Sequence, residues 1–93
     1  MSSKNMKMII AIVRDADIDK ILKALLEKEF RVTRIASSGG FFRRGNATLM
    51  MGVETEKVEE AIQIIREHCE QSLDLAVKHA TVFVLDIDHF EQV

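Results

Sequence analysis

The residues best suited to chemistry gather in one stretch, Phe30 to Val53, which reads FRVTRIASSGGFFRRGNATLMMGV. It holds four arginines and no acid, so it carries a charge of +4 while the rest of the chain carries −6. Two glycines break the stretch near its middle, and Phe41 and Phe42 follow them directly. Glycines let backbone N–H groups converge on an anion, arginines add charge and a fixed fork of donors, and phenylalanines offer rings for stacking. This combination favours non-covalent binding of a small phosphate-bearing nucleotide.

A plainer interpretation of the same stretch is a hairpin tip whose charges are solvated. Two features favour binding instead. Phe41 and Phe42 stand where a hairpin tip would ordinarily be polar, and no acid neutralises the arginines. The stretch is neither a Walker A loop, because no Gly-Lys-Ser/Thr follows its glycines, nor the fingerprint of a Rossmann domain.

Polar residues elsewhere form no catalytic or metal-binding pattern. His68 and Cys69 are neighbours on an expected helix, so their side chains point about 100° apart and lack the spacing that one metal requires. Asp86, Asp88 and Glu91 have no nucleophile or base in register with them. We therefore expect a protein that is not an enzyme and that needs neither metal nor cofactor.

Length and composition are those of one small domain, spanning residues 1–93, with a disordered N-terminus over residues 1–6. No apolar run approaches the roughly 20 residues of a membrane span, and the one after the polar N-terminus is too short for a signal peptide. A single cysteine fits a reducing compartment, so we expect a cytoplasmic protein. A net charge of −2 argues against general nucleic-acid binding.

Two elements precede the arginine-rich stretch. Residues 7–13, KMIIAIV, are almost wholly apolar and predict a strand that is buried on both faces. Apolar residues from Ile18 to Leu26 recur with helical spacing and predict an amphipathic helix, with Asp15 or Asp17 as its N-cap.

The arginine-rich stretch itself predicts strands over residues 30–35 and 47–53. Gly52 is costly inside a strand, which indicates a bulge or a close approach by another group. A second helix follows, with Thr55 as its expected cap. Its expected apolar stripe consists of Val58, Ala61, Ile62, Ile65 and Cys69. The remaining expected elements are a strand over residues 80–85 and a short helical turn at Asp88, His89 and Phe90. Residues 70–79 fit a helix end, a loop or a short strand.

This order predicts an α+β fold, the ferredoxin-like β-α-β-β-α-β sandwich, with two helices on one face of a four-stranded antiparallel sheet. The strands at residues 7–13, 47–53 and 80–85 are apolar on both faces, however, and no element is left to cover the second face. We therefore expect a cyclic oligomer whose sheets face inward.

Five segments, KMIIAIVRDAD, FRVTRIASSGGFFRRGN, TLMMGV, ATVFVL and DHFEQ, resemble the cyclic-di-AMP receptor family of P-II-like signal-transduction proteins, the PstA type. The resemblance covers residues 7–92 and is most specific from Phe30 to Gly52. It implies a homotrimer of ferredoxin-like subunits that binds cyclic-di-AMP between neighbouring subunits and catalyses no reaction.

The resemblance also implies which residues bind the ligand. It places an arginine and a threonine on the strand that enters the pocket, and backbone and ring contacts in the turn. An asparagine and a glycine line the base pocket, and a glutamine comes from the C-terminal tail. The implied set is Arg31, Thr33, Gly40, Phe41, Phe42, Asn46, Gly52 and Gln92.

Two departures from the family bear on function. Members usually have a long loop rich in glycine and proline before the last strand, whereas residues 70–79, EQSLDLAVKH, contain neither. Glu29 also stands where a neutral polar residue is common, and its negative charge would oppose binding of an anion.

The alternative function is a P-II-like regulatory module that docks a partner protein through its basic loop and binds another adenine nucleotide or none.

Overall fold

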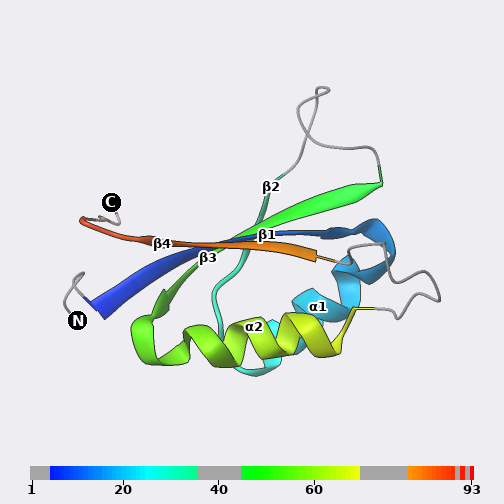
Figure 1. Ribbon diagram of the computed structural model, residues 1–93, viewed down its shortest axis with the longest axis horizontal. Helices are drawn as coiled ribbons and strands as arrows, with labels where there is room; N and C mark the ends of the chain where they lie inside the picture. Colours follow the sequence, from blue (N-terminus) through cyan, green and yellow to red (C-terminus); the bar gives the residue numbers. More distant parts are fainter. Residues whose placement is uncertain (1–4, 36–44, 70–79, 90, 92) are drawn as a thin grey trace.

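The computed structural model describes residues 5–35, 45–69, 80–89, 91 and 93. Its elements are β1 (Met6–Arg14), α1 (Asp15–Glu27), β2 (Thr33–Ile35), β3 (Asn46–Glu54), the 3-10 turn η2 (Thr55–Lys57), α2 (Val58–Glu67) and β4 (Ala80–Asp86). The strands form one antiparallel sheet in the order β2-β3-β1-β4, and both helices cover the same face of it (Figure 1). The predicted α+β ferredoxin-like sandwich is therefore confirmed.

The hydrophobic core lies between the sheet and the helices. Alternate residues of the two central strands point into it, as the twofold period of a strand requires. Helical spacing brings one stripe of each helix to meet them. The buried apolar residues are Ile9, Ala11, Val13, Ile18, Ile21, Leu25, Phe30, Ala47, Leu49, Met51, Val53, Ala61, Ile64 and Ile65. Ile62, predicted for this stripe, is only half-buried, and Ile64 lies in the core instead.

The N-termini of the helices correct the predicted caps. Arg14 is the N-cap of α1, and neither Asp15 nor Asp17 caps it. The backbone N–H of Asp15 donates instead to the carbonyl of Gly45 at 2.8 Å, so the approach to β3 supplies what a side-chain cap would. Gly45 has a φ of 88°, in the left-handed region that favours glycine. Thr55 does not cap α2.

The C-terminus of α1 explains why β2 is shorter than predicted. The N–H of Phe30 donates to the carbonyl of Leu25 at 3.0 Å, and the N–H of Glu29 donates to the carbonyl of Leu26 at 3.0 Å. This is a Schellman motif, with Glu29 at a φ of 66° where glycine is preferred. Since Phe30 is committed to the helix end and to the core, the strand expected from residue 30 begins only at Thr33.

Several smaller predictions also change. Met6 opens β1, and the carbonyl of Asn5 accepts a hydrogen bond from Thr55 Oγ1 at 2.9 Å, so residues 5 and 6 of the predicted disordered segment have defined contacts. Asp88 and His89 are not helical. Predictions for residues 1–4, 70–79 and Phe90 lie outside the described residues. No helix in the described part of the chain is long and apolar enough to cross a membrane.

Candidate ligand-binding face of the sheet

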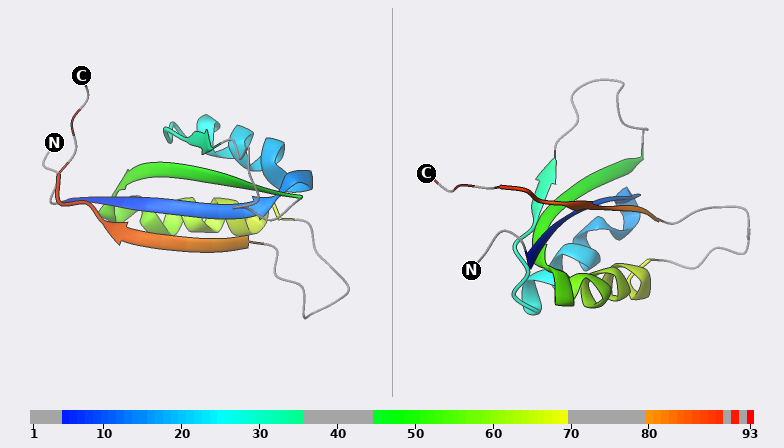
Figure 2. Two further views of the ribbon diagram at one scale, coloured as in Figure 1. Left: turned by 90° about the horizontal axis from the view of Figure 1, so that it is seen from above. Right: turned by 60° about the vertical axis from the view of Figure 1, so that its left-hand side comes forward.

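The face of the sheet opposite the helices, here called the open face, is covered by no other element of the described chain (Figure 2). In antiparallel pairing, residues directly opposite one another share a face, so the strand register fixes its rows. From one end to the other these are Asn46 beside Arg14; Ile35, Thr48, Ile12 and Thr81; Thr33, Met50, Ile10 and Phe83; Gly52, Met8 and Leu85; and Glu54 beside Met6.

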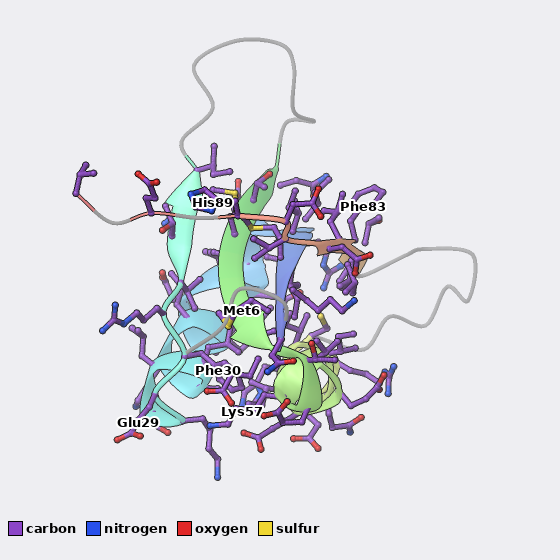
Figure 3. The ribbon with its side chains drawn as sticks, turned by 90° about the vertical axis from the view of Figure 1, so that its left-hand side faces the viewer. Met6, Glu29, Phe30, Lys57, Phe83 and His89 are labelled. Atoms are coloured by element: carbon purple, nitrogen blue, oxygen red, sulfur yellow. The ribbon has the colours of Figure 1, made fainter. Side chains whose placement is uncertain are left out.

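Most of the open face is apolar. Met8, Ile10 and Met50 are half-buried, although nothing in the described chain lies above them. Phe83 is 51% exposed and Leu85 is 46% exposed. Figure 3 shows Phe83 projecting from β4 away from the helices. The prediction that these strands are apolar on both faces is therefore confirmed, and no described helix or strand covers one of those faces.

Three of the predicted site residues lie on the open face along β2 and β3. Thr33 is exposed opposite Met50, and Gly52 is its diagonal neighbour, about 7–8 Å away by the usual strand spacing. Asn46 lies on the same face but at the other end of β3, about 20 Å from Gly52 along the strand. The structure thus brings Thr33 and Gly52 together and separates Asn46 from them.

The remaining predicted site residues divide into two groups. Arg31 is exposed just before β2 begins. Gly40, Phe41, Phe42 and Gln92 lie outside the described residues. The tail that carries Gln92 leaves β4 just beyond Leu85, which shares a row with Met8 and Gly52. It therefore leaves the sheet at the same end as Gly52.

The structure narrows the reason for a glycine at position 52. Gly52 pairs regularly with Met8, so the predicted bulge is absent. A Cβ added there would meet Met6 Cε at 3.8 Å, an ordinary contact, and the residue is exposed. Folding of the single chain does not require a glycine here. Of the two predicted explanations, only a close approach by another group remains.

The described arginines near β2 and the open face differ in where they lie and in their partners. Arg31 and Arg34 are exposed and form no ion pair with another described residue. Arg34, however, lies opposite Leu49 and so belongs to the helix side of β2. Arg14 is engaged by Asp17, whose Oδ2 lies 3.4 Å from Arg14 Nε. Arg31, exposed two residues before Thr33, is therefore the described arginine left as a candidate to meet an anion near the open face.

Cys69 and the acidic and histidine side chains of the described residues supply neither a reactive nucleophile nor a metal site at the open face. Burial, with a smaller effect from nearby Asp17, raises the pKa of the Cys69 thiol, which donates to the Ile65 carbonyl at 3.2 Å. A thiol with a raised pKa is a poor nucleophile at neutral pH. In the parts of the chain that the structure describes, no group of three His, Cys, Asp or Glu residues could hold a metal ion.

Sequence reasoning missed Thr48 of β3. Its side chain is buried on the open face, and its Oγ1 has no hydrogen-bond partner among the described residues. A threonine within an apolar strand fits the strand propensity so well that the pattern gives no separate signal for its hydroxyl.

Known proteins share both the sequence and the fold. A family model described as "Cyclic-di-AMP receptor" matches residues 6–76. A crystal structure of a functionally unknown protein from Pediococcus pentosaceus ATCC 25745 is 34% identical, with a TM-score of 0.78, and the match covers 97% of this chain and 99% of that one. Arabidopsis thaliana PII bound to citrate has the same fold at 22% identity, with a TM-score of 0.66 over 92% of this chain and 85% of that one.

Proposed function

Because the chain belongs to the cyclic-di-AMP receptor family, as its sequence predicted, we propose that it is a cytoplasmic, non-catalytic signalling protein that binds cyclic-di-AMP between the subunits of a homotrimer. The observation that carries this proposal is Gly52. It lies exposed beside Thr33 on an uncovered apolar face, and the fold of the single chain gives no reason for a glycine there. A ligand or a neighbouring subunit that approaches the backbone closely would give one.

The open face supports the assembly. Phe83 and Leu85 are large apolar side chains about half exposed, and Met8, Ile10 and Met50 continue the surface between them and β2. Contiguous apolar surface of this kind usually marks an interface. Three copies with their sheets facing inward would bury it and leave the helices outside. Light scattering should report a trimer, and a stable monomer at micromolar concentration would contradict the assembly.

The residues at the edge of this face suit a dinucleotide of adenosine. The hydroxyl of Thr33 and the amide of Asn46 each offer a donor and an acceptor for a purine edge. Arg31 offers charge for a phosphate. Gly40, Phe41 and Phe42 would add backbone and stacking contacts, and Gln92 a contact from the tail. Since Asn46 and Gly52 stand far apart on one β3, a ligand between subunits would meet them from different copies.

Calorimetric titration with cyclic-di-AMP, ATP and ADP tests the ligand. We expect cyclic-di-AMP to bind most tightly. Gly52→Ala should weaken it because the added methyl group intrudes on the approach, and Arg31→Ala should weaken it tenfold or more, about the loss of one charge-assisted hydrogen bond. Arg66→Ala is the matched control, because Arg66 is exposed on α2 and hydrogen-bonds only Gln63 among the described residues.

The melting temperatures of these variants decide how a loss of binding is interpreted. Arg31 and Gly52 are both exposed, so neither substitution should change the melting temperature by more than a few degrees. If both variants unfold, the residues are structural and the proposed site is wrong.

A second function is favoured by Arg34. This arginine is exposed on the helix side of β2, so the basic stretch does not present all its charge to the open face. The alternative is a regulatory module that docks an acidic surface of a partner protein and binds another adenine nucleotide or none. The titration would favour it if cyclic-di-AMP gave no heat, and Arg34→Glu would then abolish docking while Arg31→Ala had a smaller effect.

A further inference from the structure

Thr48 presents a buried polar group that hydrogen-bonds no described residue. The residue is 2% exposed, and its Oγ1 has no hydrogen-bond partner among the described residues. Its row across the open face places Ile35 of β2 on one side and Ile12 of β1 on the other. Both neighbours are half-buried isoleucines that cannot accept or donate a hydrogen bond.

A hydroxyl in this position weakens the single chain. A buried donor left without a partner loses its hydrogen bonds to water and gains none in return. Valine has nearly the same shape as threonine and is equally suited to a strand, without the hydroxyl. The hydroxyl of Thr48 is therefore useful only in a state of the protein where another group bonds it.

The neighbours of Thr48 indicate what that group is. Along β3 on the open face it follows Asn46 and precedes the row of Thr33, about 7 Å from each of these positions by strand geometry. It thus lies between the polar residues of the proposed site that are otherwise separated. A purine that hydrogen-bonds Asn46 of one copy would lie only about 7 Å along β3 from Thr48 of the same copy.

We propose that Thr48 is an additional ligand-binding residue whose hydroxyl hydrogen-bonds a polar atom of the bound nucleotide, an inference that rests on the proposed function. A hydroxyl rotates to donate or to accept, so it can serve either kind of atom on a purine edge. Because Thr48 is buried, a hydrogen bond formed to its hydroxyl is strong, since the local dielectric is low.

The test replaces the hydroxyl with a methyl group in the full-length protein. Thr48→Val should bind cyclic-di-AMP about threefold to tenfold more weakly by calorimetric titration, the loss of one ordinary hydrogen bond. Its melting temperature without ligand should rise, because an unpaired buried hydroxyl has been removed. Thr48→Ser keeps the hydroxyl and should keep most of the affinity.

Thr81→Val is the matched control, because Thr81 shares the row of Thr48 but is exposed on the far strand β4. It should leave the affinity unchanged. The inference is overturned if Thr48→Val binds as tightly as the wild type. It is also overturned if Thr48→Val loses its trimeric state or its stability, which would assign the hydroxyl to a subunit contact or to the fold. Wild-type protein that binds no nucleotide at all would overturn the proposed function along with it.

Discussion

The two faces of the sheet are built from the same kinds of residue and end in different environments. Ile9 and Ile10 are neighbours in β1, yet Ile9 is 0% exposed beneath the helices while Ile10 is half-buried on the open face. The helices supply a cover for one face, and no described element supplies one for the other. An apolar strand therefore indicates that both of its faces are suited to burial, but it does not say whether the same chain or another molecule supplies the cover.

The largest expected effect comes from substitutions that compare these two isoleucines. Ile9→Ala removes a fully buried side chain and leaves a cavity, so it should lower the free energy of unfolding by about 2–5 kcal/mol at any protein concentration. Ile10→Ala should lower it less in the dissociated chain, and its effect should grow with concentration because the proposed trimer buries the open face. Urea denaturation over a hundredfold range of concentration measures both.

Phe83→Ala, in the same row as Ile10, provides an independent check of this difference. It should show the same dependence on concentration as Ile10→Ala. The comparison fails if Ile9→Ala and Ile10→Ala are equally destabilising at every concentration, because Ile10 would then belong to the core of the single chain.

The sequence predicted the elements and their order because the apolar residues are patterned so clearly. Continuous apolar runs in β1 and β3 indicate strands suited to burial on both faces, and helical spacing in α1 identifies the helix face that packs against the sheet. The helix ends were predicted less well. The N–H of Asp15 is bonded by the carbonyl of Gly45, thirty residues further along the chain, and no local pattern signals a cap of that kind. The Schellman motif was hidden because glutamate, not glycine, occupies its left-handed position at Glu29.

The candidate site was predictable only where side-chain type implies a role. The glycine at position 52 was noticed because glycine is unfavourable in a strand, and the structure then removed one of its two explanations. Thr48 was not noticed because threonine is favourable in a strand. Charge alone groups Arg34 with Arg31, although the register places Arg34 on the helix side of the sheet. Direction and burial depend on strand pairing, which composition does not contain.

A smaller effect on stability is expected at Glu29, which lies at the end of a helix and not on the open face. Glu29 adopts a φ of 66° at the end of α1, which is unfavourable for any residue with a Cβ. Glu29→Gly should raise the free energy of unfolding by about 1 kcal/mol, since glycine fits the Schellman motif without strain. Denaturant unfolding measures the gain, and Glu29→Ala, which keeps a Cβ, controls for the lost charge.

Glu29 also tests whether its charge affects binding. If this carboxylate opposes the anionic ligand, both Glu29→Gly and Glu29→Ala should tighten cyclic-di-AMP binding slightly, and the gain should fade at high salt. If only stability changes, and only in Glu29→Gly, then Glu29 acts on the helix end alone.

The smallest expected effect concerns Cys69, which packs against the core just after α2. Burial raises the pKa of its thiol, first by desolvation and then through Asp17. The folded chain therefore holds the thiol proton more tightly than the unfolded chain does. The resulting stability is fully present below the pKa of the unfolded thiol and declines as the pH rises from that value toward the higher pKa of the folded thiol.

Ionisation would also remove the hydrogen bond that the thiol donates to the Ile65 carbonyl at 3.2 Å. Wild-type protein should thus lose slightly more stability than Cys69→Ala between neutral pH and about pH 10, where lysines titrate equally in both proteins. Urea midpoints at the two pH values measure this difference. If the wild type and Cys69→Ala lost the same stability between the two pH values, the folded chain would not hold the thiol proton more tightly than the unfolded chain does. Because Cys69 belongs to the helix layer, its substitution should leave cyclic-di-AMP binding at neutral pH unchanged if the ligand binds, as proposed, on the open face.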